Sequence, residues 1–155
     1  MLAEEVGQLL KSKGLTIVLA ESCTGGKLGD MITDVSGSSA YFLGGVVSYS
    51  NQAKMELLGV DETTLDAKGS VSEEVALQMA AGARKKLHAD IGVGITGIAG
   101  PTGGTKAKPV GLVYIAVSSD RTAVCTKNLF KGSRRDVKMH SAVKALEMVK
   151  EFLLK

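Results

Sequence analysis

The chain has 155 residues, enough for a single domain with its own hydrophobic core. With 45% hydrophobic and 23% charged residues it has the composition of an ordinary globular protein, and a net charge of +3 is too small to indicate a nucleic-acid partner or an anionic membrane surface. No apolar run is long enough to span a bilayer, the acidic residues near the start argue against a signal peptide, and Cys23 and Cys125 lack the spacing of a zinc site or a disulfide framework. We therefore expect one cytoplasmic domain over residues 1–155, with reduced thiols and no metal.

Helices and strands alternate along the first half of the chain. The apolar spacing predicts a helix that ends at Gly14, a β-branched run predicts a buried strand, and Gly59 closes a short helix after a second strand. The predicted elements are a helix over 2–12, a strand over 15–20, a helix from 24 or 25 to 33, a strand over 41–50 and a helix over 51–58.

The second half continues this alternation and then adds a hairpin. A capping box at Ser70 or Ser72 begins a helix, and Asp120-Arg121 forms the hairpin turn. The predicted elements are a helix over 72–88, a strand over 90–97, a loop over 98–109, strands over 110–119 and 122–130, and a helix over 133–153. Together they predict a three-layer α/β/α sandwich with a mixed, mostly parallel five-stranded sheet. Ligands of such sheets bind at the carboxyl ends of the parallel strands, so the loops after residues 20 and 97 are the expected site.

The first candidate site is the polar turn Ser22-Cys23-Thr24-Gly25-Gly26. Amides at the start of a helix bind anions, and the two glycines would let a phosphate or an oxyanion come close. An ordinary helix cap made by Ser22 or Thr24 explains the same residues equally well. A P-loop is excluded, because Leu28 rather than Ser or Thr follows Lys27.

The stretch 92–97, GVGITG, matches the dinucleotide-binding spacing but not its context, because a Gly/Pro loop follows where a helix is required. Its glycines indicate close approach of a neighbouring strand or of a ligand. Thr96 ends the stretch, either as a polar site residue or simply as a residue that favours strands.

Two further stretches carry side chains suited to chemistry. In residues 37–54, a lysine with a lowered pKa can activate a serine, which makes Lys54 a candidate base for Ser38 or Ser39; a solvated Lys54 is the plainer interpretation. At the start of the last helix, Ser133 predicts an N-cap, and Arg134 stands where a helix disfavours cations unless they hold a phosphate. A solvated basic turn explains Arg134 about as well.

Three long, ordered motifs identify a family: AESCTGGKLGDMITDVSGSSAYFLGGVVSYSNQAK, GSVSEE and GITGIAGPTGGTKAKPVG. Over about residues 4–152 the chain resembles the C-terminal domain family of the competence-damage protein CinA, known as nicotinamide-mononucleotide deamidase. The resemblance implies an anticodon-binding-domain-like α/β/α fold and metal-independent hydrolysis of a carboxamide, without a cofactor. It implies a small pyridine mononucleotide as partner, neither nucleic acid nor membrane, and we expect a homo-oligomer.

The resemblance also gives each candidate stretch a role. We expect Ser39 to be the nucleophile, Lys54 its base and Tyr49 the residue that positions them, although Ser22 can exchange roles with Ser39. The residues expected to hold the oxyanion or the substrate and its 5′-phosphate are Ser22, Thr96, Thr24, Gly25, Gly26, Gly97 and Arg134. A non-catalytic nucleotide-binding or sensing module of the same fold is the alternative function.

Overall fold

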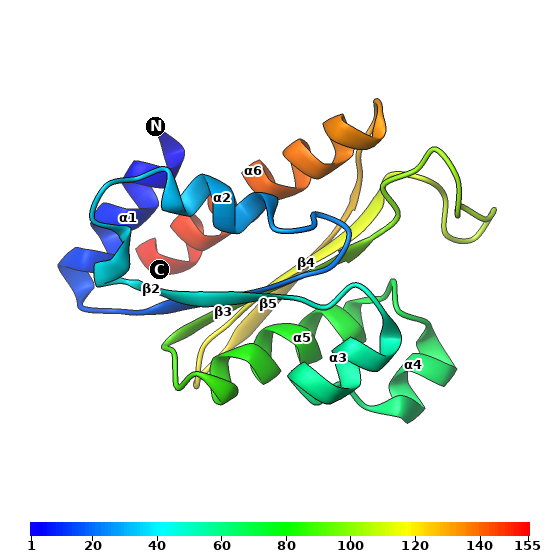
Figure 1. Ribbon diagram of the computed structural model, residues 1–155, viewed down its shortest axis with the longest axis horizontal. Coiled ribbons are helices and arrows are strands. Elements are labelled where there is room, and N and C mark those ends of the chain that lie inside the picture. The colour runs from blue at the N-terminus through cyan, green and yellow to red at the C-terminus, as the bar shows by residue number, and fades with distance from the viewer.

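A five-stranded sheet is the middle layer of the computed structural model, which describes all 155 residues (Figure 1). Its strands are β1 (Ile17–Glu21), β2 (Phe42–Val47), β3 (Ile91–Gly97), β4 (Leu112–Ser118) and β5 (Ala123–Leu129). They lie in the order β2-β1-β3-β4-β5, with β1 parallel to both neighbours and β4 antiparallel to both of its own. The predicted three-layer fold with a mixed, mostly parallel sheet is confirmed.

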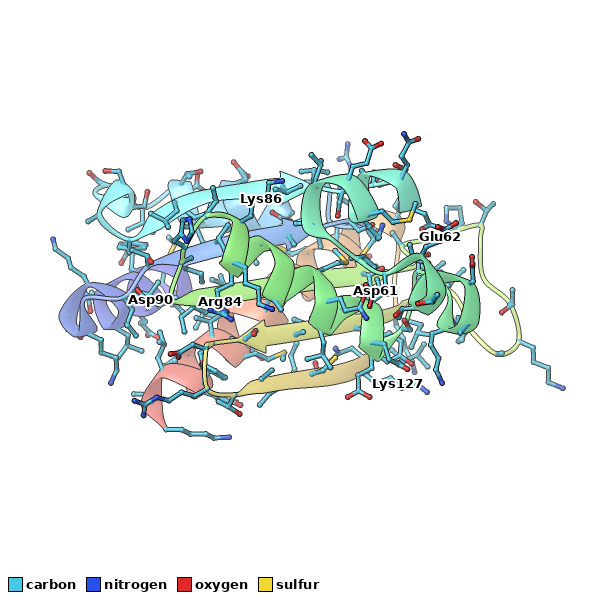
Figure 2. The ribbon with its side chains drawn as sticks, turned by 90° about the horizontal axis from the view of Figure 1, so that it is seen from below. Asp61, Glu62, Arg84, Lys86, Asp90 and Lys127 are labelled. Carbon is cyan, nitrogen blue, oxygen red and sulfur yellow. The ribbon has the colours of Figure 1, made fainter.

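Helices cover both faces of the sheet. One face carries α1 (Leu2–Lys13), α2 (Lys27–Thr33) and α6 (Arg134–Leu154), and the face seen in Figure 2 carries α3 (Asn51–Leu58), α4 (Glu62–Lys68) and α5 (Glu73–Lys86). Successive residues of a strand point to opposite faces. Ile17 and Leu19 therefore enter the core beneath α1, α2 and α6, and Val18 and Ala20 enter the core beneath α3, α4 and α5. Burial on both faces explains why β1 is a continuous apolar run. No helix is both long enough and apolar enough to cross a membrane.

The main differences from the prediction are two element boundaries and one additional helix. The second helix begins at Lys27 rather than at residue 24 or 25, because Gly25 and Gly26 adopt positive φ angles of 61° and 104°. β2 is shorter than the predicted strand over 41–50. The helix α4 was not predicted, since Leu65 is its only buried residue and one apolar side chain gives no periodic signal.

Two glycines of β3 allow the helix α5 to approach the sheet closely. A Cβ atom at Gly92 or Gly94 would overlap the carbonyl oxygen of Ala80 or Ala76 on α5. A Cβ atom at Gly97 would instead overlap the neighbouring strand β4. The expected close approach of a neighbouring strand is therefore found at Gly97, whereas at Gly92 and Gly94 the neighbour is a helix.

Candidate active site

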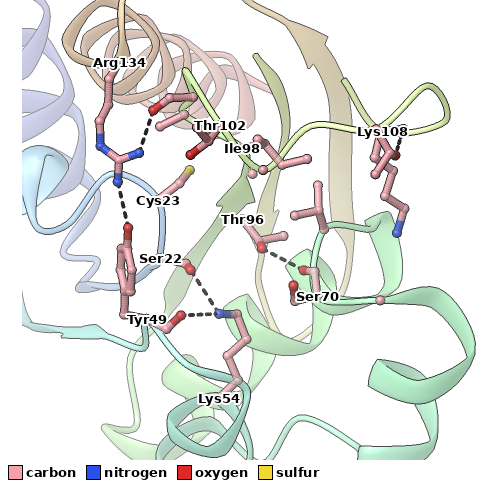
Figure 3. A pocket seen from close by; sticks show the side chains of 17 residues that line it. Ser22, Cys23, Tyr49, Lys54, Ser70, Thr96, Ile98, Thr102, Lys108 and Arg134 are labelled. Carbon is pink, nitrogen blue, oxygen red and sulfur yellow. Dashed lines mark hydrogen bonds between the residues drawn. The ribbon is translucent and has the colours of Figure 1, made fainter. Parts of the chain in front are cut away.

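A cavity of about 450 Å³ lies at the carboxyl ends of the parallel strands, as the strand topology predicts (Figure 3). Its wall consists of the turn after β1, the segment after β2, the end of β3 with the loop 98–109, the 69–71 connection and the start of α6. Of the predicted site residues, it brings together Ser22, Tyr49, Lys54, Thr96, Gly97 and Arg134.

The centre of the cavity is a contact between Ser22 and Lys54. Lys54 Nζ lies 2.9 Å from Ser22 Oγ, and the two side chains come from segments 32 residues apart. Ser22 follows β1 directly, and Lys54 lies on α3, whose N-cap Ser50 accepts a hydrogen bond from Ala53 N. Because β1 and β2 are adjacent and parallel, their carboxyl ends bring these two side chains to one place.

Lys54 is a buried amine without an acidic partner. It is 2% exposed, and besides Ser22 its Nζ approaches only the carbonyl oxygens of Ser48 at 2.8 Å and Tyr49 at 3.5 Å. Burial disfavours the charged form and lowers the pKa of Lys54 below its usual value. In the structure Nζ donates to all three oxygens, Ser22 Oγ included. When the amine is neutral, two N–H groups remain for the carbonyls and its lone pair can accept the serine proton, so the same contacts allow Lys54 to act as a base.

The expected pairing of Ser39 with Lys54 is absent from the structure. Ser39 lies exposed in the short 3₁₀ turn Ser38–Ala40 before β2, whereas Lys54 follows β2. Six strand residues at about 3.3 Å each separate the two ends of β2 by roughly 20 Å. Ser39 therefore lies near the opposite end of β2, and Ser22 is the serine that contacts Lys54.

The turn after β1 does not present a phosphate cradle. The side chain of Glu21, the last residue of β1, reaches the N-terminus of α2. There its carboxylate accepts hydrogen bonds from Leu28 N at 3.0 Å and Gly29 N at 2.9 Å. The buried hydroxyl of Thr24 donates to the same carboxylate at 2.6 Å. Thr24, Gly25 and Gly26 are thus outside the cavity wall, and the carboxylate of Glu21 lies where a phosphate was expected, so the structure gives no support to the expectation that they bind substrate.

Thr96 and Tyr49 line the cavity, but their hydroxyl groups have partners other than those expected. Thr96 donates its hydroxyl proton to Ser70 O at 2.7 Å, so this proton is not free for an oxyanion. The Tyr49 hydroxyl accepts from Arg134 Nη2 at 2.8 Å and does not contact the Lys54 side chain.

Backbone amides of the cavity wall remain available as donors. Cys23 N and Ala99 N donate to no backbone carbonyl, and both residues line the cavity. Cys23 N belongs to the residue next to Ser22, where an oxyanion formed by attack from Ser22 would lie within its reach. The adjacent Cys23 thiol is not a competing nucleophile, because burial raises its pKa to about 12.

The cavity wall carries cations and no acidic side chain. Arg134 donates to Gly100 O at 2.7 Å as well as to Tyr49, and Lys108 donates to the carbonyl of Lys68 on the opposite side (Figure 3). Arg134 is fixed by the capping box of α6, in which Ser133 Oγ accepts from Asp136 N at 3.2 Å. Neither of these two cations forms an ion pair. An anionic ligand would supply the missing charge.

Three site residues escaped prediction from the sequence. The predicted strand ended at residue 20, so Glu21 was given no role; Ser48 was placed inside a longer strand, and Lys108 in the loop 98–109. Glu21 lies six residues before α2, and only the folded turn brings its carboxylate to the helix start, so no local pattern identified it.

The comparisons with known proteins agree over the whole domain. The profile of the CinA C-terminal domain matches residues 1–153. A relative described as a competence-damage inducible protein in Desulforudis audaxviator is 52% identical over 96% of the chain, and a CinA-like protein of Geotalea uraniireducens is 48% identical over 96%. The chain spans 36% of the length of each of these two relatives.

Solved structures give the same result. The competence/damage inducible protein CihA from Agrobacterium tumefaciens has a TM-score of 0.96 and 38% identity, with 99% of this chain and 94% of that chain covered. A CinA superfamily protein from Escherichia coli has a TM-score of 0.93 and 32% identity, with 99% and 88% covered.

Proposed function

The chain belongs to the CinA C-terminal domain family, and from this we propose that it hydrolyses the carboxamide of nicotinamide mononucleotide to nicotinate mononucleotide and ammonia. The observation that carries the proposal is the buried, acid-free Lys54 amine 2.9 Å from Ser22 Oγ in a cavity rich in cations. A module that only binds a nucleotide has no need of an amine whose pKa burial lowers beside a serine hydroxyl.

In the proposed reaction Ser22 is the nucleophile. Neutral Lys54 accepts the hydroxyl proton while Ser22 Oγ attacks the carboxamide carbon, and the resulting oxyanion is stabilised by free amides such as Cys23 N. Protonated Lys54 then gives its proton to the leaving nitrogen, the C–N bond breaks and ammonia departs. A water molecule, deprotonated by the same amine, hydrolyses the remaining serine ester and releases the carboxylate.

The ends of the cavity support a nucleotide as the substrate. Arg134 presents N–H groups of a guanidinium that has no carboxylate partner, which suits a 5′-phosphate, and Lys108 adds a second uncompensated charge. We assign the phosphate to Arg134, and Tyr49 holds this guanidinium in place.

The test is release of ammonia and nicotinate mononucleotide from nicotinamide mononucleotide by the purified chain in H₂¹⁸O, with Lys54→Met beside the wild type. We expect turnover that places one ¹⁸O atom in the product and that is lost in the variant. Because the base must be neutral, the activity should rise with pH through the lowered pKa of Lys54. Binding of nicotinamide mononucleotide without turnover would instead support the sensing module.

A further inference from the structure

We propose that Glu21 is a positioning residue that fixes the side chains of Ser22 and Lys54 relative to each other. This inference deepens the proposed function and rests on Ser22 as its nucleophile. Glu21 is 3% exposed and does not line the cavity, so it would act through its neighbours and not on the substrate.

The carboxylate of Glu21 ties the two sides of the Ser22 turn together. Glu21 itself belongs to β1, while its donors follow Ser22 in the chain. Its Oε1 accepts from Thr24 Oγ1 at 2.6 Å and from Leu28 N at 3.0 Å, and its Oε2 accepts from Gly29 N at 2.9 Å. Ser22 lies between these two anchored sides. Its hydroxyl is therefore aimed from a turn that is fixed at both ends to one buried group.

The backbone of Glu21 holds the other member of the pair. Its carbonyl oxygen accepts from Ser48 N at 2.8 Å and lies 3.4 Å from Ser48 Oγ. The carbonyl of the fully buried Ser48 in turn accepts from Lys54 Nζ at 2.8 Å. A shift of Glu21 therefore displaces Ser22 directly and Lys54 through Ser48.

The substitution Glu21→Gln separates the role of this carboxylate from the role of side-chain size. Both carboxylate oxygens accept hydrogen bonds from N–H or O–H donors. An amide group offers one oxygen and one NH₂, so in either orientation the NH₂ faces a donor. The turn must then move, and Ser22 Oγ moves with it.

Asp90, directly before β3, provides a control at the other end of β1. Its Oδ2 accepts from Thr16 N at 2.8 Å and Thr16 Oγ1 at 3.0 Å, directly before β1. Figure 2 places Asp90 at the opposite end of the sheet from the loop 98–109. Asp90→Asn thus makes the same carboxylate-to-amide change at an exposed position beside the start of β1, away from Ser22.

The experiment measures covalent labelling of the full chain by a sulfonyl fluoride, with the modified residue located by mass spectrometry, and kcat and KM for nicotinamide mononucleotide alongside. We expect labelling of Ser22 in the wild type, and in Glu21→Gln a rate and a kcat at least about tenfold lower with KM nearly unchanged, since a small misplacement of reacting groups has effects of this order or larger. Asp90→Asn should keep the wild-type labelling rate and kcat.

Thr24 keeps the test decisive if Glu21→Gln does not fold. Thr24→Val removes the 2.6 Å donor to Glu21 at nearly constant volume, and Thr24→Ser retains it. We expect slower labelling in Thr24→Val and recovery of most of the rate in Thr24→Ser, with both variants folded by circular dichroism.

Two results would overturn the inference, and they differ from each other. Wild-type labelling rates in Glu21→Gln or in Thr24→Val, or an equal decrease in Asp90→Asn, would remove the role of Glu21 and leave Ser22 as the nucleophile. A wild-type chain that is labelled at a residue other than Ser22, or is neither labelled nor active, would overturn the proposed function itself and this inference with it.

Discussion

At the scale of single residues, the environment of Lys54 decides what the site can do. A lysine in water is charged at neutral pH and is a poor base, whereas burial without a carboxylate favours its neutral form. The same environment makes the folded state less tolerant of a proton on this amine. Function and stability are therefore linked through one pKa.

This linkage predicts a pH-dependent difference in stability between the wild type and Lys54→Met. The folded-state pKa of Lys54 lies below its usual value of 10.5, so between these two values the unfolded chain binds more protons than the folded one. The stability of the wild type relative to the variant should therefore increase as the pH rises through this window, and be smallest below it. Urea unfolding of both proteins across the window measures the difference, and a difference that does not change with pH would contradict the prediction.

Residue types predicted most of the site, but not the pairing within it. Ser22, Tyr49, Lys54, Thr96, Gly97 and Arg134 were all candidates from the sequence and all line one cavity. Ser39 was expected beside Lys54 on the family resemblance, yet an intervening strand separates them. Distance along a chain says little about which hydroxyl an amine will meet once a strand lies between them.

At the scale of elements, the site depends on how closely α5 packs on β3. Gly92 and Gly94 leave no side chain between the strand and the carbonyls of Ala80 and Ala76. Near the end of β3, the side chain of Thr96 reaches Ser70 O in the connection before α5. Alternating apolar residues made β3 predictable from the sequence. Gly92 and Gly94 predicted a close neighbour, but not that this neighbour would be α5.

Gly94→Ala should therefore destabilise the domain. The new Cβ atom would overlap Ala76 O and press α5 away from the sheet, at a cost of about 1–3 kcal/mol for overpacking. For a domain of this size each kcal/mol corresponds to about 2–4 °C in Tm. Thermal unfolding followed by circular dichroism measures this loss.

Gly45→Ala in β2 is the control for that measurement. Its Cβ atom would have its nearest neighbour at 3.5 Å, an ordinary contact, and Gly45 has no positive φ angle. We expect a Tm close to that of the wild type. Equal losses in the two variants would show that the overlap with α5 is not the cause.

At the scale of the whole molecule, strand order assembles the site. β1 lies between β2 and β3, so Ser22 has Ser48, Tyr49 and Lys54 on one side and Thr96 on the other. The rule for parallel sheets predicted which loops would form the site, whereas the lateral order of strands, which places Ser22 at its centre, was not predictable from local sequence patterns.

The distribution of charge over the whole molecule supports the same site. The four ion pairs of the protein lie outside the cavity, and the two cations in its wall, Arg134 and Lys108, are left without acidic partners. A net charge of +3 alone favoured no particular partner. The presence of Arg134 and Lys108 in a cavity without Asp or Glu is the feature that favours a small anionic substrate.

The most direct test of this account compares Ser22→Ala and Ser39→Ala with the wild type in the hydrolysis of nicotinamide mononucleotide. Ser22 lies 2.9 Å from Lys54, whereas Ser39 is exposed near the other end of β2. We predict that Ser22→Ala loses about 10³-fold or more in kcat, as removal of a nucleophile does, and that Ser39→Ala retains wild-type turnover. Turnover that survives in Ser22→Ala and disappears in Ser39→Ala would contradict the account.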